Sequence, residues 1–276
     1  MEGYLKVRND VELFYKKDIV RSPKAIILIN HGFAEHLGRY DYVAKKLKES
    51  DYTVYRYDLR GHGQTKSTKG HVDSYEDFIE DCDQMVELIK SENKDMPIFM
   101  LGHSMGGFIT CIYGLKYPEK LKGQIFSGAA VNTLPPARGI RSNLLEVLNL
   151  FAQTKTIKNI VEKDICSVEE VVKDYMNDPL VLKEATINFY VQFLVKGRRY
   201  INKNIGNYKY PCFIAHGEKD KIVPKEIGYY LHDNISSEDK EIRIYDNLYH
   251  EILNEREKDQ VLGDMIMWLD KRMIYK

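Results

Sequence analysis

The strongest constraint on the fold is a serine between glycines, in the sequence GHSMG at residues 102–106. The apolar run 98–101 precedes it, and the helix-like run 108–113 follows it. This order predicts a strand, a sharp turn and a helix, with the hydroxyl of Ser104 exposed at the tip of the turn. Small residues are needed on either side because the turn forces the serine into strained backbone angles. The motif alone is a weak signal, so the residues that could act with Ser104 decide its meaning.

Two further residues follow Ser104 in the chain order that one fold of serine hydrolases uses. Asp220 comes after the predicted strand 211–217, and His250 lies in the loop after the predicted strand 241–245. Loops after the carboxyl ends of parallel strands meet at one edge of a sheet. We therefore expect Ser104 to be the nucleophile, His250 the base that takes its proton, and Asp220 the acid that orients His250.

Other acids and histidines compete for two of these roles. Asp233, Asp239 and Asp246 fit by chain order alone, but none follows an apolar strand with a turn-forming glycine, as Asp220 follows Gly217. The competing histidines mostly precede the serine or lie inside a predicted element; they are His31, His36, His62, His71, His103, His216 and His232.

Backbone amides near the serine could hold the negative charge that develops on a carbonyl oxygen during acyl transfer. One donor is expected to be the amide of Met105, the residue after the nucleophile. The other is expected in the loop after the predicted strand 25–29, where we favour Phe33 over Gly32.

Three polar residues near these loops are candidates for substrate binding. Glu35 and Arg39 lie on the same loop as Phe33, where they could bind a polar headgroup or pair with each other. His103, in the serine motif, is the third candidate. The run RGHG at residues 60–63 ends another predicted strand, and we expect it to support the site loops rather than to take part in chemistry.

Short apolar runs and amphipathic helical patterns alternate along most of the chain. The run 25–29 is continuously apolar, which is typical of a central parallel strand buried on both faces. Further strands are expected at 52–57, 98–101, 124–127, 211–217 and 241–245, helices at 40–49 and 76–90, and a hairpin within residues 5–15. The sequence therefore predicts an α/β fold with a mostly parallel central sheet flanked by helices.

The alternation stops between residues 130 and 207, which read as several amphipathic helices. Apolar residues fall at helical spacing at Leu144, Leu145, Leu148 and Phe151, and again at Val168, Val171, Val172 and Tyr175. Long insertions tend to be functional, so we expect a core domain of residues 1–129 and 208–276 and an all-helical cap, or lid, of residues 130–207. The alternative is that this block only enlarges the core.

The leucines of this insertion bear on what the site accepts. They indicate an apolar acyl group and transient contact of the cap with a membrane surface. For most of them, however, packing against the core domain is the favoured interpretation.

Charge and cysteine patterns exclude several classes of protein. The 41 basic and 41 acidic residues balance, and there is no basic stripe of the kind that binds nucleic acid. The first residues lack an apolar signal segment, and no run approaches the roughly 18 apolar residues of a membrane span. Four scattered cysteines, Cys82, Cys111, Cys166 and Cys212, lack metal-ligand or disulfide spacing. We expect a cytoplasmic protein with reduced thiols and no metal.

Taken together, these residues resemble the monoacylglycerol lipase and lysophospholipase branch of the α/β-hydrolases. The matching segments are HGFAEH at 31–36 with Arg39 and Tyr40, DLRGHG at 58–63, GHSMGG at 102–107, DPL at 178–180, His216 and Gly217 with Asp220 and Val223, and YHE at 249–251 with Asn254 and Glu255. They span nearly the whole chain, and the cap matches least. Two departures are Phe33, where many relatives carry a small residue, and Thr65, where a serine is often found.

The resemblance implies an α/β-hydrolase fold with a helical cap and a serine esterase that works without a cofactor. Its substrates would be small-molecule fatty-acyl esters of glycerol or lysophospholipids. Two alternatives are an esterase or thioesterase for short-chain or aromatic acyl groups, and a catalytically silent binding module of the same fold. The intact set of Ser104, Asp220 and His250 argues against the silent module.

Overall fold

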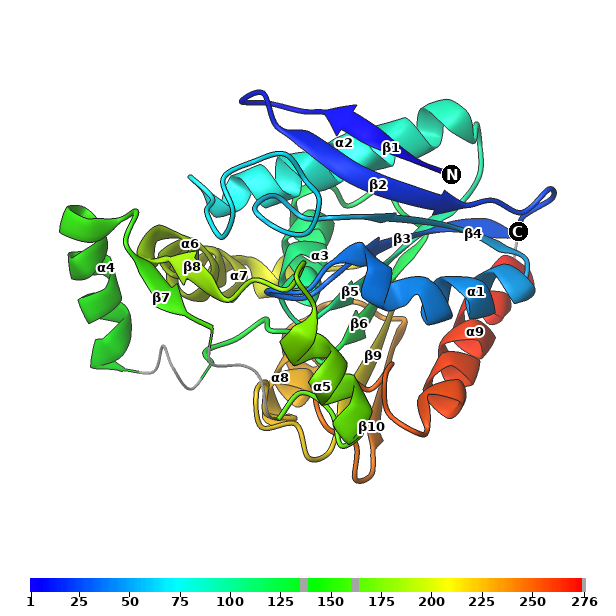
Figure 1. The fold of residues 1–276 in the computed structure, drawn as a ribbon. Helices are drawn as coiled ribbons and strands as arrows, with labels where there is room; N and C mark the ends of the chain where they lie inside the picture. The colour runs from blue at the N-terminus through cyan, green and yellow to red at the C-terminus, as the bar shows by residue number, and fades with distance from the viewer. Residues whose placement is uncertain (135–138, 160–163, 275–276) are drawn as a thin grey trace.

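The computed structural model describes residues 1–134, 139–159 and 164–274. Its centre is an eight-stranded sheet in the order β1-β2-β4-β3-β5-β6-β9-β10 (Figure 1). The strands are β1 (Glu2–Lys6), β2 (Glu12–Asp18), β3 (Ala25–Asn30), β4 (Tyr52–Tyr57), β5 (Ile98–His103), β6 (Gly123–Ser127), β9 (Cys212–Gly217) and β10 (Lys240–Tyr245). Only β1 and β2 run antiparallel to their neighbours, so the expected hairpin and the mostly parallel sheet are both confirmed.

Helices cover both faces of the sheet because its central strands are apolar on both sides. In β3, Ile26 and Leu28 belong to one hydrophobic cluster, while Ile27 and Ile29 belong to another on the opposite face. The first cluster includes side chains from α2 (Tyr75–Glu92), α3 (Met105–Lys116) and α8 (Glu226–Asn234). The second includes side chains from α1 (Asp41–Glu49) and α9 (Lys258–Ile274). The predicted α/β architecture is confirmed.

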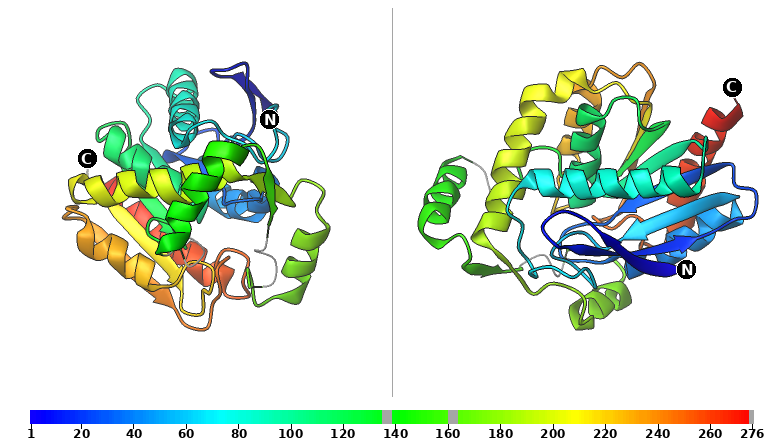
Figure 2. Two further views of the ribbon diagram at one scale, coloured as in Figure 1. Left: turned by 90° about the vertical axis from the view of Figure 1, so that its left-hand side faces the viewer. Right: turned by 90° about the horizontal axis from the view of Figure 1, so that it is seen from above.

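The chain between β6 and β9 lies beyond one end of the sheet, as two views show (Figures 1 and 2). Its described elements are α4 (Ile140–Ala152), β7 (Thr156–Lys158), α5 (Glu169–Asn177), β8 (Glu184–Thr186), α6 (Ile187–Val191), a π-helix (Gln192–Gly197), α7 (Arg198–Asn204) and a 3-10 helix (Ile205–Asn207). The expectation of an all-helical insertion is wrong, because β7 and β8 pair as a separate antiparallel sheet. Each has three residues, which is too short for an alternating pattern to stand out in a sequence.

Apolar residues of α4 are exposed rather than packed against the core. Leu144, Leu148 and Leu150 are 55%, 43% and 77% exposed, so the favoured packing of these leucines against the core is wrong. One face of α4 packs on α6 and the π-helix. The apolar residues of α4 are not confined to that face, so some of them stay exposed. In the described ranges, no helix has the length and apolar character needed to cross a bilayer.

Candidate active site

The turn between β5 and α3 presents the candidate nucleophile. Ser104 has φ 51° and ψ −115°, a strained conformation for a residue with a side chain. The turn is held closed by tight packing, because a Cβ at Gly106 would collide with the backbone carbonyl of Asn30 at the end of β3. A glycine is therefore required where α3 begins against the sheet.

Asp220 and His250 meet at the same edge of the sheet, although 30 residues separate them. The Nδ1–H of His250 donates to Oδ2 of Asp220 at 2.7 Å. The other carboxylate oxygen, Oδ1, accepts from the backbone amides of Ile222 and Val223 at 2.9 and 2.8 Å. This donor set fixes the carboxylate, and the contact assigns the imidazole proton to Nδ1, which leaves Nε2 able to accept a proton.

Burial and charge act in opposite directions on this pair. Burial tends to raise the pKa of Asp220, but the neighbouring charge of His250 and the hydrogen bonds from His250 and His216 hold that pKa well below its usual range. Burial likewise tends to lower the pKa of His250, and the charge and hydrogen bond of Asp220 outweigh it, so the pKa of His250 is raised above 6.5.

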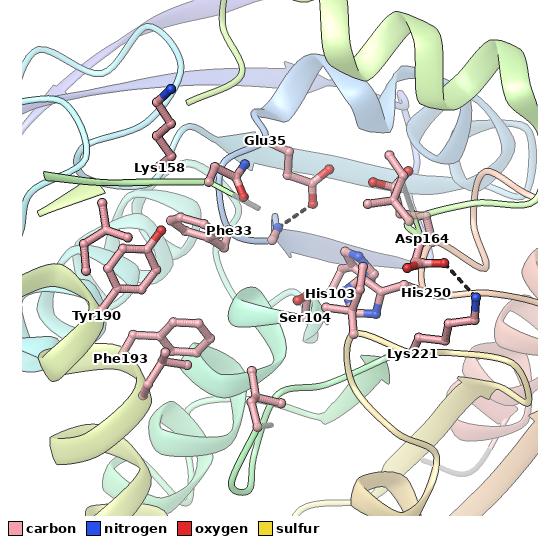
Figure 3. A pocket seen from close by; sticks show the side chains of 18 of the residues that line it. Phe33, Glu35, His103, Ser104, Lys158, Asp164, Tyr190, Phe193, Lys221 and His250 are labelled. Carbon is pink, nitrogen blue, oxygen red and sulfur yellow. Dashed lines mark hydrogen bonds and ion pairs between the residues drawn. The ribbon is translucent and has the colours of Figure 1, made fainter. Parts of the chain in front are cut away.

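Ser104 and His250 line one cavity and lie next to each other in it (Figure 3). Within the described part of the chain, no hydrogen bond joins the serine hydroxyl to the imidazole. Hydrogen bonds of catalytic groups are often long without substrate and shorten in the complex, so the absence of this bond does not exclude proton transfer.

The two candidate oxyanion amides have no acceptor among the described residues. Met105 is the first residue of α3, where a helical amide lacks an intrahelical partner. The amide of Gly32, the second choice for the other donor, is already taken by Glu35 Oε1 at 2.5 Å, which leaves the amide of Phe33. A Cβ built on Gly32 would lie 3.2 Å from Cβ of Ser104, so this loop runs directly beside the serine.

Glu35 and Arg39 form an ion pair, the second of the two alternatives left by the sequence. Arg39 Nη1 donates to Glu35 at 3.1 Å, and the guanidinium also makes two bonds to Glu251, at 2.5 and 2.8 Å. The ring of Tyr175 lies 4.8 Å from the guanidinium. Glu35 and Glu251 line the cavity while Arg39 lies behind them. Substrate binding by Glu35 and Arg39 stays a prediction.

His103 also lines the cavity, where its ring stacks 4.7 Å from the ring of His250. Its Nδ1–H donates to the carbonyl of Ser127 at 3.0 Å. Burial, followed by the neighbouring charge of His250, lowers the pKa of His103 to about 4. His103 is therefore neutral near pH 7. Substrate binding by His103 stays a prediction.

Two further residues outside the predicted site make buried polar contacts. His216, which competes for the role of base, lies beneath Asp220 and donates its Nε2–H to the carbonyl of Val223 at 2.7 Å. Arg60 makes a two-bond ion pair with Asp81 of α2, at 2.9 and 2.7 Å. Glu251, which was not among the predicted site residues, lines the cavity, and its place in the matching segment YHE at 249–251 was the signal for it.

The cavity has a volume of about 1020 Å³ and is mostly apolar. The insertion supplies much of its apolar lining, from Leu134, Leu144, Leu145, Leu148, Ile157, Ile165, Tyr190, Phe193 and Leu194. The strand loops supply the polar side chains of Glu35, His103, Ser104, Lys221, His250 and Glu251, and the insertion adds Arg141, Lys158, Asn159 and Asp164 to the lining. Figure 3 shows Glu35, His103, Ser104 and His250 together and Lys158 apart from them. In the described ranges, no three His, Cys, Asp or Glu side chains are placed to hold a metal ion.

The family described as Serine aminopeptidase, S33, matches residues 21–257. The chain belongs to this family. Within it, the chain is 31% identical over 247 residues to the monoacylglycerol lipase of Mycolicibacterium smegmatis, covering 90% of this chain and 88% of that protein. It is 29% identical over 256 residues to the monoglyceride lipase of Mus musculus, covering 91% and 84%. Phospholipase YtpA of Bacillus subtilis is 27% identical, over 87% and 92%.

Solved structures agree with this family assignment. The monoacylglycerol lipase of Paleococcus ferrophilus superposes with a TM-score of 0.85 at 25% identity, covering 95% of this chain and 99% of that one. A carboxyl esterase from Bacillus coagulans, at 23% identity, has the same fold with a TM-score of 0.88. This member of the S33 family is an ester-hydrolysing α/β-hydrolase, so the predicted family branch and fold are confirmed. The alternative of a silent binding module is set aside.

Proposed function

We propose that this carboxylic-ester hydrolase cleaves monoacylglycerols or lysophospholipids through Ser104, His250 and Asp220. The observation that carries the proposal is the Asp220–His250 hydrogen bond at 2.7 Å beside the strained Ser104, at the polar end of an apolar cavity. A base held in one tautomer next to a serine that lines a cavity is what nucleophilic acyl transfer needs.

In the proposed mechanism, Ser104 Oγ attacks the acyl carbonyl while Nε2 of His250 takes its proton. Asp220 orients the imidazole and stabilises the imidazolium. The amides of Met105 and Phe33 hold the oxyanion, and the alcohol departs with the proton from His250. Water then attacks the acyl-enzyme, His250 accepts a proton from that water, and the proton returns to Ser104 as the fatty acid is released.

The substrate class rests on how the cavity is divided. An acyl chain fits the apolar wall contributed by the insertion, and a glycerol-like alcohol fits the end that carries Glu35, His103 and Glu251. Relatives named as monoacylglycerol lipase and as phospholipase support these two classes. The alternative of a short-chain or aromatic acyl group is less suited to a cavity of about 1020 Å³.

The insertion acts as a cap in this proposal, with residues 130–207 as its bounds. Its helix α4 places Leu144 and Leu148 at the cavity while Leu150 and Phe151 are 77% and 86% exposed. Exposed apolar side chains on a helix that lines a cavity are typical of contact with a lipid surface. The cap is thus proposed to receive lipid esters from a membrane or micelle.

Two measurements on purified protein test the proposal. A panel of monoacylglycerols, lysophosphatidylcholines, acyl thioesters and nitrophenyl esters of increasing chain length should give the highest kcat/KM for a long-chain glycerol or lysophospholipid ester. A fluorophosphonate probe should label the wild type, and Ser104→Ala should abolish both labelling and hydrolysis. Labelling that persists in the alanine variant would place the nucleophile elsewhere, and a preference for short or aromatic esters would replace the substrate assignment.

A further inference from the structure

One contact joins the insertion to the loop that carries the candidate oxyanion amide. Nε2 of His36 lies 2.8 Å from Oδ2 of Asp178, at the end of α5. Nδ1 of His36 accepts from the amide of Gly38 at 3.2 Å, so the proton sits on Nε2 and is donated to Asp178. The other oxygen of Asp178 accepts from the amide of Leu180 at 2.7 Å, which fixes the carboxylate. The mechanism proposed above uses neither residue.

The loop between Phe33 and His36 needs such support because it is strained. Ala34 has φ 69°, in the left-handed region that costs a residue with a side chain about 1–2 kcal/mol. Such conformations persist only where their surroundings enforce them. The carbonyl of Ala34 accepts from the amide of Leu182 at 2.8 Å, four residues after Asp178. The insertion therefore makes hydrogen bonds to both ends of the segment 34–36, which directly follows Phe33.

The same part of the insertion is also tied to the loop of the candidate base. The amide of Glu251, next to His250, donates to the carbonyl of Ile165 at 2.7 Å. The amide of Ser167 donates to Glu255 at 2.9 Å. These hydrogen bonds hold residues 164–183 against a second loop of the core domain. Asp178 therefore has a fixed position, and its hydrogen bond can fix the position of His36.

We propose that Asp178 is a positioning residue, which holds the Phe33 amide in place for the oxyanion through its hydrogen bond to His36. The proposal rests on the proposed function, because it assumes that the Phe33 amide is an oxyanion donor. It assigns a catalytic consequence to a residue of the insertion that touches neither the substrate cavity nor the reacting groups.

The test compares Asp178→Ala with Asp178→Asn, whose single carbonyl oxygen can still accept from His36 while its NH2 group replaces the oxygen that accepts from Leu180. Each is measured with nitrophenyl butyrate, a small soluble ester, and rates are divided by the concentration of active sites titrated with a fluorophosphonate. A second readout is inhibition by butylboronic acid, whose tetrahedral adduct with a serine occupies the oxyanion site. The control is Asp174→Ala, which removes an exposed carboxylate one turn earlier in α5.

Losing an oxyanion donor outright costs about 10²–10³ in kcat, so a misplaced donor should cost about tenfold. We expect D178A to lower kcat about tenfold with little change in KM, and to weaken boronate inhibition by the same factor. D178N and D174A should stay within about twofold of wild type. His36→Ala should match D178A, and the double variant should be no worse than either single one.

Wild-type kcat and boronate inhibition in D178A would overturn the proposal, as would additive losses in the double variant. A loss confined to the titrated active fraction would also overturn it, because that result marks a fold defect. If D178A does not fold, Asp178→Ser serves instead, since a serine hydroxyl can accept from the Leu180 amide but is too short to reach His36. Activity that persists in Ser104→Ala would refute the proposed function rather than this contact.

Discussion

Two helices of the same insertion, α4 and α5, meet the rest of the molecule in opposite ways. Helix α4 packs on other parts of the insertion and leaves apolar side chains such as Leu150 and Phe151 exposed. The segment around α5 is tied by polar contacts to both loops that flank Ser104, as the His36–Asp178 bond illustrates. The insertion thus has an anchored part, residues 164–183 around α5, which contacts the site loops. Its outer part is α4, whose apolar side chains are exposed.

The largest effect on turnover is expected from removing His250, the proposed base, whose loop is hydrogen-bonded to the anchored part of the insertion. His250→Ala should lower kcat by about 10⁴–10⁶, close to the loss in Ser104→Ala, because triad members act as a unit. The measurement is nitrophenyl butyrate hydrolysis, with circular dichroism to establish folding. His232→Ala on α8, a histidine paired with Asp233 at the surface, is the control and should keep full activity. A folded H250A protein with near-normal turnover would mean that the anchored loops do not carry the chemistry.

The free energy of unfolding should separate the site loop that contacts α5 from the outer helix α4 by several kcal/mol. Arg39→Met keeps the aliphatic stem but leaves the buried carboxylates of Glu35 and Glu251 without their cation, which should cost about 3–5 kcal/mol. Arg199→Met removes the partner of Glu146 on α4, where the arginine side chain is 52% exposed, and should cost about 0–1 kcal/mol.

Urea unfolding of both arginine variants measures this difference. The midpoint of Arg39→Met should fall well below that of the wild type, and the midpoint of Arg199→Met should stay near it. Equal losses in the two variants would contradict the distinction between the site loops, which contact α5 through Arg39 and Tyr175, and the outer helix α4.

The sheet and its edge were predictable because their signals are local. The run 25–29 is apolar without a break, and GHSMG at 102–106 demands a strand, a strained turn and a helix. Chain order then singled out Asp220 and His250, which the structure brings within 2.7 Å of each other. These features need only a few neighbouring residues and a rule of topology.

The insertion was predicted less well because its structure depends on distant partners. His36 and Asp178 are 142 residues apart, and nothing in either segment announces their hydrogen bond. The spacing of Leu144 and Leu148 predicts a helix correctly, but periodicity does not say what covers its apolar face. The structure shows these two leucines at a cavity and partly exposed, where core packing was favoured.

An intermediate effect should appear at lipid surfaces and nowhere else. Leu150→Ser with Phe151→Ser removes the two most exposed apolar side chains of α4 and should weaken binding to phosphatidylcholine vesicles about tenfold, since each loses part of the 1.5–3 kcal/mol of a buried large apolar side chain. Sedimentation with vesicles measures the binding. Hydrolysis of nitrophenyl butyrate in solution should be unchanged.

The control for the vesicle experiment is Met267→Ser, which removes an apolar side chain of α9 that is 56% exposed. It should leave vesicle binding unchanged. Equal losses in the α4 and α9 variants would show that exposed apolar area in general, rather than α4, governs the contact.

The smallest expected effect is a shift in the pH profile, and it tests the charge that the site loops place around the base. The groups that act on the pKa of His250 are Asp220, Glu251 and Glu35, which raise it against the lowering effect of burial. His250 must be unprotonated to accept the serine proton, so kcat/KM should fall as the pH drops through a pKa above 6.5. Glu35→Gln keeps an acceptor for the Gly32 amide but removes a negative charge, which lowers the pKa of His250 and moves the acid limb to lower pH. The shift should be about half a pH unit, because Arg39 already offsets part of that charge.

The control is Asp174→Asn, which neutralises an exposed carboxylate on α5 and should leave the acid limb of the kcat/KM profile in place. A move of the acid limb of Glu35→Gln to higher pH would show that Glu35 does not act on His250 through its charge.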